Sequence, residues 1–246
     1  MSPDEKQHPP TSAILVAAGE SSRMALAAGD RKPFLMLAER LVIEHACAAF
    51  AACEWVREII LVAHPEDVTR LRDLSETSTD LSLVTAVVAG GASRTASVQN
   101  GVAAASGDVE LIAVHDAARP LVTQRLIERT LRAAARDGAA LAALPAADTI
   151  KVSADGERVD STLDRSVLWC AQTPQVFAAS ALRELLERAA AEGLRVTDDA
   201  ALFEHYDRPV TLVPGETTNV KLTAPDDLDL AAAILRTRGG REVRGS

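Results

Sequence analysis

A turn of small residues with positive side chains close behind it is the part of this sequence that most directly suggests chemistry. Residues 17–24 form the turn, which contains Gly19 and Arg23, and Lys32 follows a few positions later. Small residues let backbone N–H groups approach a phosphate chain closely, while Arg23 and Lys32 add the positive charge that a polyphosphate requires. We interpret this segment as part of a nucleoside triphosphate site.

The order of residues in this turn excludes two commoner nucleotide loops. The turn lacks the G-x-G-x-x-G spacing of a dinucleotide fold, and the apolar run 59–62 leads into Ala63 and His64 without an acid for a ribose. No G-K-[S/T] follows Gly19, which excludes a Walker loop. Taken alone, an Ala/Gly turn is also compatible with plain chain reversal, which stays open as an alternative.

Two further loops carry groups that bind phosphates or hydroxyls. Gly90 and Gly91 precede a helical pattern that contains Arg94 and Ser97, so this turn again offers backbone N–H groups, although an ordinary helix cap would use the same residues. Further on, a carboxylate and a guanidinium, Asp116 and Arg119, follow another apolar run. They would orient a substrate or pair with each other, whereas the neighbouring His115 is expected to be structural.

The elements that must position these loops alternate between apolar strands and amphipathic helices. Expected strands are 13–17, 58–63, 83–88, 111–114 and 139–144, and expected helices are 41–53, 67–74, 95–105 and 124–135. This rhythm predicts an α/β fold: a Rossmann-like open, mostly parallel twisted sheet with helices on both faces. Ligands bind at the carboxyl ends of the strands in such sheets, where the loops above begin.

The rhythm breaks after residue 144, where a hairpin is expected. Residues 148–152 alternate, Asp155-Gly156 supplies a tight turn, and residues 157–163 return. A lone two-stranded hairpin is barely stable in water, so an arm of about residues 147–166 needs a surface to lie against. A second copy of the chain is one candidate, in which case Thr149 and Arg165 would complete the partner's pocket. The alternative is a hairpin folded back on its own domain.

Two later segments are less informative. Residues 168–177 place polar groups between apolar anchors, a pattern that suits a pocket wall or an ordinary loop. Residues 219–223 are expected to form a short strand whose Lys221 faces either inward or outward.

Composition sets the class of protein. The chain has 246 residues, of which 48% are hydrophobic, and its net charge of -9 argues against a nucleic-acid surface. Three cysteines without C-x-x-C spacing predict core packing rather than zinc or disulfides. We expect flexible tails at 1–10 and 238–246 around a single domain at 11–237. No signal or membrane segment is apparent, which predicts a cytoplasmic protein.

Taken in order, these segments resemble the 2-C-methyl-D-erythritol 4-phosphate cytidylyltransferases, which belong to the nucleotide-diphospho-sugar transferase superfamily. The resemblance covers nearly the whole chain. It depends on Ala17-Ala18-Gly19 with Arg23-Met24, Gly90-Gly91 with Arg94 and Ser97-Val98, His115-Asp116-Ala117-Ala118-Arg119-Pro120, Asp164-Arg165 before Leu168-Trp169, Thr173-Pro174-Gln175, Thr197-Asp198-Asp199 and Asn219-Val220-Lys221-Leu222-Thr223.

The resemblance implies a reaction and a set of roles. The substrate phosphate attacks the α-phosphorus of CTP and releases pyrophosphate, with Mg²⁺ held mainly by the CTP phosphates and no protein metal ligand assigned. Arg23 and Lys32 resemble the transition-state stabilisers, while Lys221 and the partner subunit's Arg165 resemble the groups that position the attacking phosphate in a homodimer. The implied nucleotide contacts are Ala17, Ala18, Gly19, Gly90, Gly91, Arg94, Ser97, Asp116 and Ala117. The implied substrate contacts are Asp116, Arg119, Thr149, Arg165, Thr173 and Thr197.

One departure and two alternatives accompany this resemblance. The family usually has a proline directly before the lysine, whereas here Arg31 precedes Lys32 and Pro33 follows it, so that Arg31 is an alternative occupant of the pocket. Pro33 would restrict Lys32 to extended backbone angles. We also expect the loop 25–30 to close over the triphosphate.

Ribitol 5-phosphate cytidylyltransferases share most of the motifs, and a non-catalytic nucleotide sensor on the same scaffold is the alternative from another class.

Overall fold

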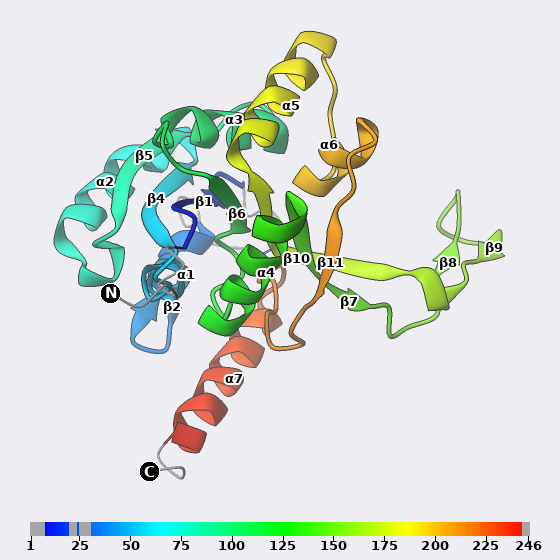
Figure 1. Ribbon diagram of the computed structural model, residues 1–246. Coiled ribbons are helices and arrows are strands. Elements are labelled where there is room, and N and C mark those ends of the chain that lie inside the picture. The colour runs from blue at the N-terminus through cyan, green and yellow to red at the C-terminus, as the bar shows by residue number, and fades with distance from the viewer. Residues whose placement is uncertain (1–7, 20–23, 25–30, 243–246) are drawn as a thin grey trace, which may run out of the picture.

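A seven-stranded sheet forms the centre of the computed structural model, which describes residues 8–19, 24 and 31–242 (Figure 1). In spatial order the strands are β11 (Thr211–Pro214), β7 (Ala139–Pro145), β10 (Trp169–Ala178), β6 (Leu111–Asp116), β1 (Thr11–Ala17), β4 (Val56–Ala63) and β5 (Val84–Ala89). Neighbouring strands run parallel except at β10, which is antiparallel to both β6 and β7. The predicted open, mostly parallel sheet is therefore confirmed.

Helices cover both faces of this sheet. One face packs against α1 (Val42–Ala51), α2 (Val68–Thr77) and α4 (Gln124–Asp137), and the other against α3 (Arg94–Ala104), α5 (Ala179–Glu192) and α6 (Asp199–His205). Because side chains alternate along a strand, Leu15 of β1 joins the first core and Ile14 the second. The last helix, α7 (Asp226–Glu242), packs on a separate apolar cluster that includes Leu37 and Leu222.

Short elements complete the described part of the chain. They are the strands β2 (Met36–Leu37), β3 (Arg40–Leu41), β8 (Lys151–Val152) and β9 (Ser161–Thr162), and the 3-10 turns η2 (Lys32–Phe34), η3 (Pro65–Asp67), η4 (Thr79–Leu81) and η5 (Arg165–Val167). Among the described residues, no helix has both the length and the apolar character needed to cross a membrane.

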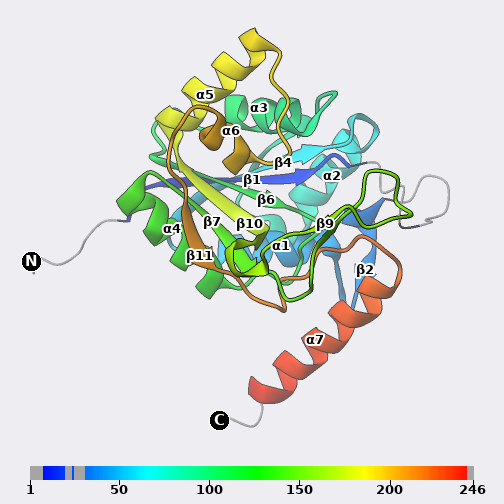
Figure 2. The ribbon, with the colours of Figure 1, turned by 90° about the vertical axis from the view of Figure 1, so that its right-hand side faces the viewer.

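The segment between β7 and β10 projects from the sheet as an arm (Figure 1), which Figure 2 shows from its tip, with the arm pointing toward the viewer. Its strands β8 and β9 pair antiparallel, and Asp155 accepts hydrogen bonds from the backbone N–H groups of Glu157 and Arg158 in the turn between them. Gly156 has a φ of 75°, the left-handed region that favours glycine. Most of the arm's side chains are exposed in this chain.

The five strands and four helices expected from the pattern of residues are present, but other expectations were wrong. Residues 219–223 form no strand, whereas residues 168–177, which the sequence left open as a pocket wall or an ordinary loop, belong mostly to the strand β10 inside the sheet. Cys170 is exposed, unlike the buried Cys47 and Cys53. The last helix continues to Glu242, into the tail expected at 238–246.

Candidate active site

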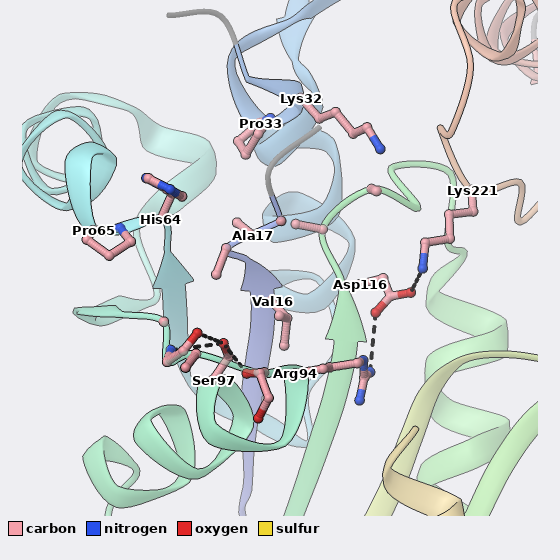
Figure 3. A pocket seen from close by; sticks show the side chains of 18 residues that line it. Val16, Ala17, Lys32, Pro33, His64, Pro65, Arg94, Ser97, Asp116 and Lys221 are labelled. Atoms are coloured by element: carbon pink, nitrogen blue, oxygen red, sulfur yellow. Dashed lines mark hydrogen bonds and ion pairs between the residues drawn. The ribbon is translucent and has the colours of Figure 1, made fainter. Parts of the chain in front are cut away.

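A cleft of about 710 Å³ opens where β1, β4, β5 and β6 end (Figure 3). The loops after these strands line it together with the start of α3, Lys32 and Lys221. This is the edge of the sheet at which open α/β folds bind ligands. The predicted site residues that line the cleft are Ala17, Ala18, Gly19, Lys32, Gly90, Gly91, Arg94, Ser97, Asp116, Ala117 and Lys221.

Close contact between two loops forms the floor of the cleft. A Cβ added to Gly90 would lie 2.4 Å from the Ala18 Cβ, so the loop after β5 approaches the loop after β1 too closely for a side chain there. The Ser97 hydroxyl accepts a hydrogen bond from Gly91 N–H at 3.0 Å and donates one to the Ser93 carbonyl at 2.8 Å. Ser97 therefore uses its hydroxyl to hold the glycine turn, through bonds to backbone groups of the protein itself.

The start of α3 faces the cleft with its backbone N–H groups. Ser93 caps the helix by accepting a hydrogen bond from Ala96 N–H at 3.1 Å, and both Ser93 and Arg94 line the cleft. Unpaired N–H groups and the helix dipole make such an end favourable for an anion. The ordinary cap and the anion site, which the sequence left as alternatives, are thus compatible at the same residues.

A chain of ion pairs crosses the wall of the cleft. Lys221 Nζ lies 2.7 Å from Asp116 Oδ2, Arg94 Nη2 lies 3.3 Å from Asp116 Oδ1, and Arg94 Nη1 lies 2.5 Å from Asp199 Oδ2. Burial acts to raise the pKa of Asp116, but Lys221 and Arg94 outweigh it and hold the pKa of this carboxyl well below its usual range. Burial likewise acts to lower the pKa of Arg94, yet Asp199 and Asp116 raise it. Asp116 and Arg94 are therefore charged at neutral pH.

Hydrogen bonds among buried residues hold the backbone of Asp116 in place on the side away from the cleft. The Thr173 hydroxyl lies 2.9 Å from His115 Nδ1 and accepts a hydrogen bond from Asp116 N–H at 3.1 Å, while His115 Nε2 lies 3.1 Å from the Arg119 carbonyl. A carbonyl can only accept, so Nε2 carries the proton and Nδ1 accepts from Thr173. Burial lowers the pKa of His115 to about 4 and keeps it neutral. Thr173 is buried behind Asp116 in this chain, and its predicted contact with the substrate stays a prediction.

Lys32 reaches the cleft from the 3-10 turn η2, whereas Arg31 does not reach it. Figure 3 shows the Lys32 side chain extending over the cleft towards the side where Lys221 lies. The guanidinium of Arg31 instead pairs with Glu66 at 2.5 Å and with Asp67 at 3.1 Å. The backbone of Lys32 is helical, not extended as Pro33 was expected to make it, and the extended residue is Arg31, with a φ of -132°.

The remaining predicted residues do not line this cleft. Arg119 donates hydrogen bonds to the carbonyls of Asn219 at 2.8 Å and Ala171 at 3.4 Å, and so ties the Lys221 segment to β10. Thr149 and Arg165 are exposed on the arm, where Arg165 Nη1 donates to the Ala147 carbonyl at 2.8 Å. Thr197 is exposed just before α6. Arg23 and the loop 25–30 lie outside the described residues.

Comparison with known proteins identifies the family. Residues 11–237 match the family model described as 2-C-methyl-D-erythritol 4-phosphate cytidylyltransferase. The chain belongs to this family. A member from Syntrophus aciditrophicus is 38% identical over 95% of this chain and 99% of its own length. The bifunctional IspD/IspF enzyme of an Anaeromyxobacter strain is 46% identical over 91% of this chain, which spans 56% of that protein.

Solved cytidylyltransferase structures share the fold. The enzyme from Thermus thermophilus is 35% identical, with a TM-score of 0.73 over 93% of this chain and 99% of its own. The 4-diphosphocytidyl-2C-methyl-D-erythritol synthase from Anaerococcus prevotii is 30% identical, with a TM-score of 0.78 over the same shares.

The structure also adds residues to the site of this family member to which the sequence gave no role. His64 and Pro65 line the cleft directly after β4, where the rule for carboxyl ends of strands would have placed them. Asp199 and Gln175 support the wall: Gln175 accepts hydrogen bonds from the N–H groups of Asp199 and Ala200 at 3.1 and 3.0 Å, and thereby holds Asp199 against Arg94. Both residues belong to motifs of the resemblance, but the sequence did not indicate that they are in contact.

Proposed function

We propose that this protein transfers the cytidylyl group of CTP to 2-C-methyl-D-erythritol 4-phosphate, giving 4-CDP-2-C-methyl-D-erythritol and pyrophosphate, a step in non-mevalonate isoprenoid precursor biosynthesis. The observation that carries the proposal is the convergence of Lys32, Lys221 and the start of α3 on one cleft in a member of the cytidylyltransferase family. A polyphosphate and a second phosphate need this concentration of positive charge on a chain whose net charge is -9.

The proposed chemistry needs charge and alignment more than a catalytic base. A phosphate oxygen of the acceptor forms a bond to the α-phosphorus of CTP while the bond to the bridging oxygen of pyrophosphate breaks. The second pKa of a phosphate monoester is about 6, so the nucleophile is already a dianion at neutral pH. What remains is to bring two anions together and to stabilise the negative charge that grows on the transferring group and the leaving pyrophosphate.

The two lysines of the cleft have separate roles in this proposal. Lys32 stabilises the phosphoryl oxygens, and the start of α3 receives part of the triphosphate through its N–H groups. Lys221, held at 2.7 Å by Asp116, is available to position the acceptor phosphate while Asp116 accepts hydrogen bonds from hydroxyl groups of the acceptor. The assignment of Arg23 as a second stabilising cation stays a prediction of the sequence.

We further propose a homodimer in which the arm reaches the partner's cleft. Exposed apolar side chains gather on the arm and beside it, among them Val159, Val167 and Trp169, which are 62%, 71% and 44% exposed. Exposed apolar surface of this kind is typical of protein interfaces. Thr149 and Arg165 would then approach the acceptor from the second subunit, which accounts for their distance from the cleft of their own chain.

Mg²⁺ is the metal that we propose, and the donors at the cleft fit a metal held mainly by the nucleotide. Among the described residues, no group of three or more His, Cys, Asp or Glu side chains could hold a metal ion. Of the described residues that line the cleft, only Asp116 has a carboxylate, and it is paired with cations. When bound, the metal would neutralise charge on the triphosphate. The cytoplasm as the place of the reaction stays a prediction.

The proposal is tested by measuring pyrophosphate release and CDP-alcohol formation with CTP and each of two acceptors, 2-C-methyl-D-erythritol 4-phosphate and ribitol 5-phosphate. We expect a kcat/KM at least about tenfold higher for the methylerythritol phosphate, since a pocket that fits one acceptor discriminates by that order. A preference for ribitol phosphate would reassign the acceptor. CTP binding without turnover of either acceptor would favour the nucleotide sensor.

A further inference from the structure

The turn that carries Lys32 is attached to its surroundings on both sides of the lysine. Before it, the Arg31 guanidinium pairs with Glu66 at 2.5 Å and Asp67 at 3.1 Å. After it, the guanidinium of Arg70 lies over the ring of Phe34, 3.6 Å from its centroid. Both attachments lead to the same segment, which runs from the end of β4 through η3 into α2.

This segment forms one wall of the cleft, and part of it is buried, so it can hold the η2 turn in place. His64 and Pro65 line the cleft, and His64 Nδ1 accepts a hydrogen bond from Glu66 N–H at 3.3 Å. Asp67 is buried, with a side chain only 8% exposed, and Arg31 is 16% exposed. Charge-assisted hydrogen bonds shielded from water are stronger than those on an open surface.

We propose that Arg31 is a positioning residue for Lys32: its ion pairs with Glu66 and Asp67 hold the η2 turn against the wall formed after β4, so that the lysine reaches the transferring phosphate. Arg31 takes no direct part in the reaction, because its guanidinium points to η3 and does not line the cleft. This inference rests on the role that the proposed function gives to Lys32.

A lysine needs such positioning because its side chain is long and flexible. Four rotatable bonds separate its ammonium from the backbone, so the backbone must be held for the charge to stay in place. A displacement of the order of 1 Å at a reacting centre is enough to lower a rate by roughly a hundredfold. A turn anchored at only one end would allow part of such a displacement.

The test is a double-mutant cycle in the whole enzyme, with Arg31→Ala, Lys32→Ala and the double variant. We expect Arg31→Ala to lower kcat about tenfold while KM for CTP changes less than about twofold, because the substrate is still bound but its reaction is less well aligned. In the Lys32→Ala background the same substitution should lower kcat less than about twofold. Arg31→Lys, which keeps the charge but loses the planar fork, should recover part of the rate.

Two further variants serve as a control and as a second test of the positioning role. Arg40→Ala removes a more exposed ion pair, with Asp80 at 3.2 Å, whose residues do not line the cleft, and should leave kcat unchanged. Glu66→Gln alters a side chain that is 74% exposed, so it should fold normally and still lower kcat about threefold through the loss of one pair. Glu66→Gln thus carries the test if Arg31→Ala fails to fold.

The outcomes separate this inference from the proposed function. Equal losses from Arg31→Ala in both backgrounds, or wild-type kcat for Arg31→Ala and Glu66→Gln, would overturn the positioning role while leaving cytidylyl transfer intact. A Lys32→Ala variant as active as the wild type would remove the role of the lysine itself, and the inference with it.

Discussion

Asp116 is the residue on which the charges of the cleft depend. Its carboxylate joins Lys221 to Arg94, and Arg94 in turn meets the buried Asp199. Two cations separated by one carboxylate can be held close together without repelling each other strongly. Asp116 therefore prepares the position of Lys221 before any phosphate arrives.

Replacing this carboxylate should be costly for both activity and stability. In Asp116→Asn, Lys221 and Arg94 lose their common partner, and we expect kcat/KM to fall about a hundredfold and the free energy of unfolding to fall by about 3 kcal/mol. Steady-state kinetics and urea denaturation measure the two effects. A variant with wild-type kinetics would show that the ion-pair chain serves only the fold.

His115 makes stability dependent on pH in a defined window. Its pKa is lowered by burial from 6.5 to about 4, so between these values the unfolded chain binds a proton that the folded chain excludes. Stability from this residue is present above pH 6.5 and is lost as the pH falls towards 4, by about 3 kcal/mol in total. In His115→Gln, urea denaturation should show a correspondingly smaller loss over this window. An unchanged pH profile would contradict the buried neutral imidazole.

At the scale of elements, the approach of two loops defines the floor of the cleft. Gly90 after β5 has no room for a Cβ beside Ala18 after β1. In Gly90→Ala the loops must separate, at a cost of roughly 1–3 kcal/mol. We expect KM for CTP to rise at least about tenfold.

A glycine in open surroundings provides the matched control for this change. Gly107, in the turn before β6, has nothing within 4 Å of an added Cβ, and Gly107→Ala should leave KM for CTP unchanged. A similar KM in both variants would show that the contact between the loops is not needed for the nucleotide.

Elements built from apolar patterns were predictable from the sequence, and those built from paired polar groups were not. β1, β4, β6 and β7 have buried Val, Ile, Leu and Ala side chains in continuous runs. In β10, by contrast, Gln172, Thr173 and Gln175 are buried inside the sheet, and each makes hydrogen bonds to residues far away in the sequence. A local pattern contains no information about such distant partners.

The same limit applies to residues of the site. The glycines, Asp116 and Lys32 were identified because their types and their places after strands suit phosphates and hydroxyls. Thr173 and Arg119 belong to the same motifs but support the cleft from behind, by holding Asp116 and the Lys221 segment. Motif membership predicted that they matter, and only the fold distinguishes support from contact.

For the whole molecule, the arm predicts that one complete site needs two chains. Lys32→Ala removes a charge of the cleft, and Arg165→Ala removes one of the arm. When the two variants are coexpressed with different tags, half of the dimers should be mixed, and one of the two sites in each mixed dimer has an intact cleft and an intact arm. We expect about a quarter of wild-type activity, although each variant alone is nearly inactive.

The mixed-subunit experiment also has a clear negative result. If the coexpressed pair is no more active than the variants alone while sedimentation shows mixed dimers, the arm does not serve the partner's cleft. A monomer at micromolar concentration would contradict the proposed dimer directly.

The most direct test is the rate of CDP-methylerythritol formation from CTP and 2-C-methyl-D-erythritol 4-phosphate by the wild type and by Lys32→Ala. The two rates are compared once thermal unfolding has shown that both proteins have the same midpoint. We predict turnover by the wild type and a rate roughly a hundredfold lower in the variant, corresponding to the loss of about 3 kcal/mol of transition-state stabilisation. Equal rates in the two proteins, or no product from the wild type, would contradict cytidylyl transfer by charges gathered in this cleft.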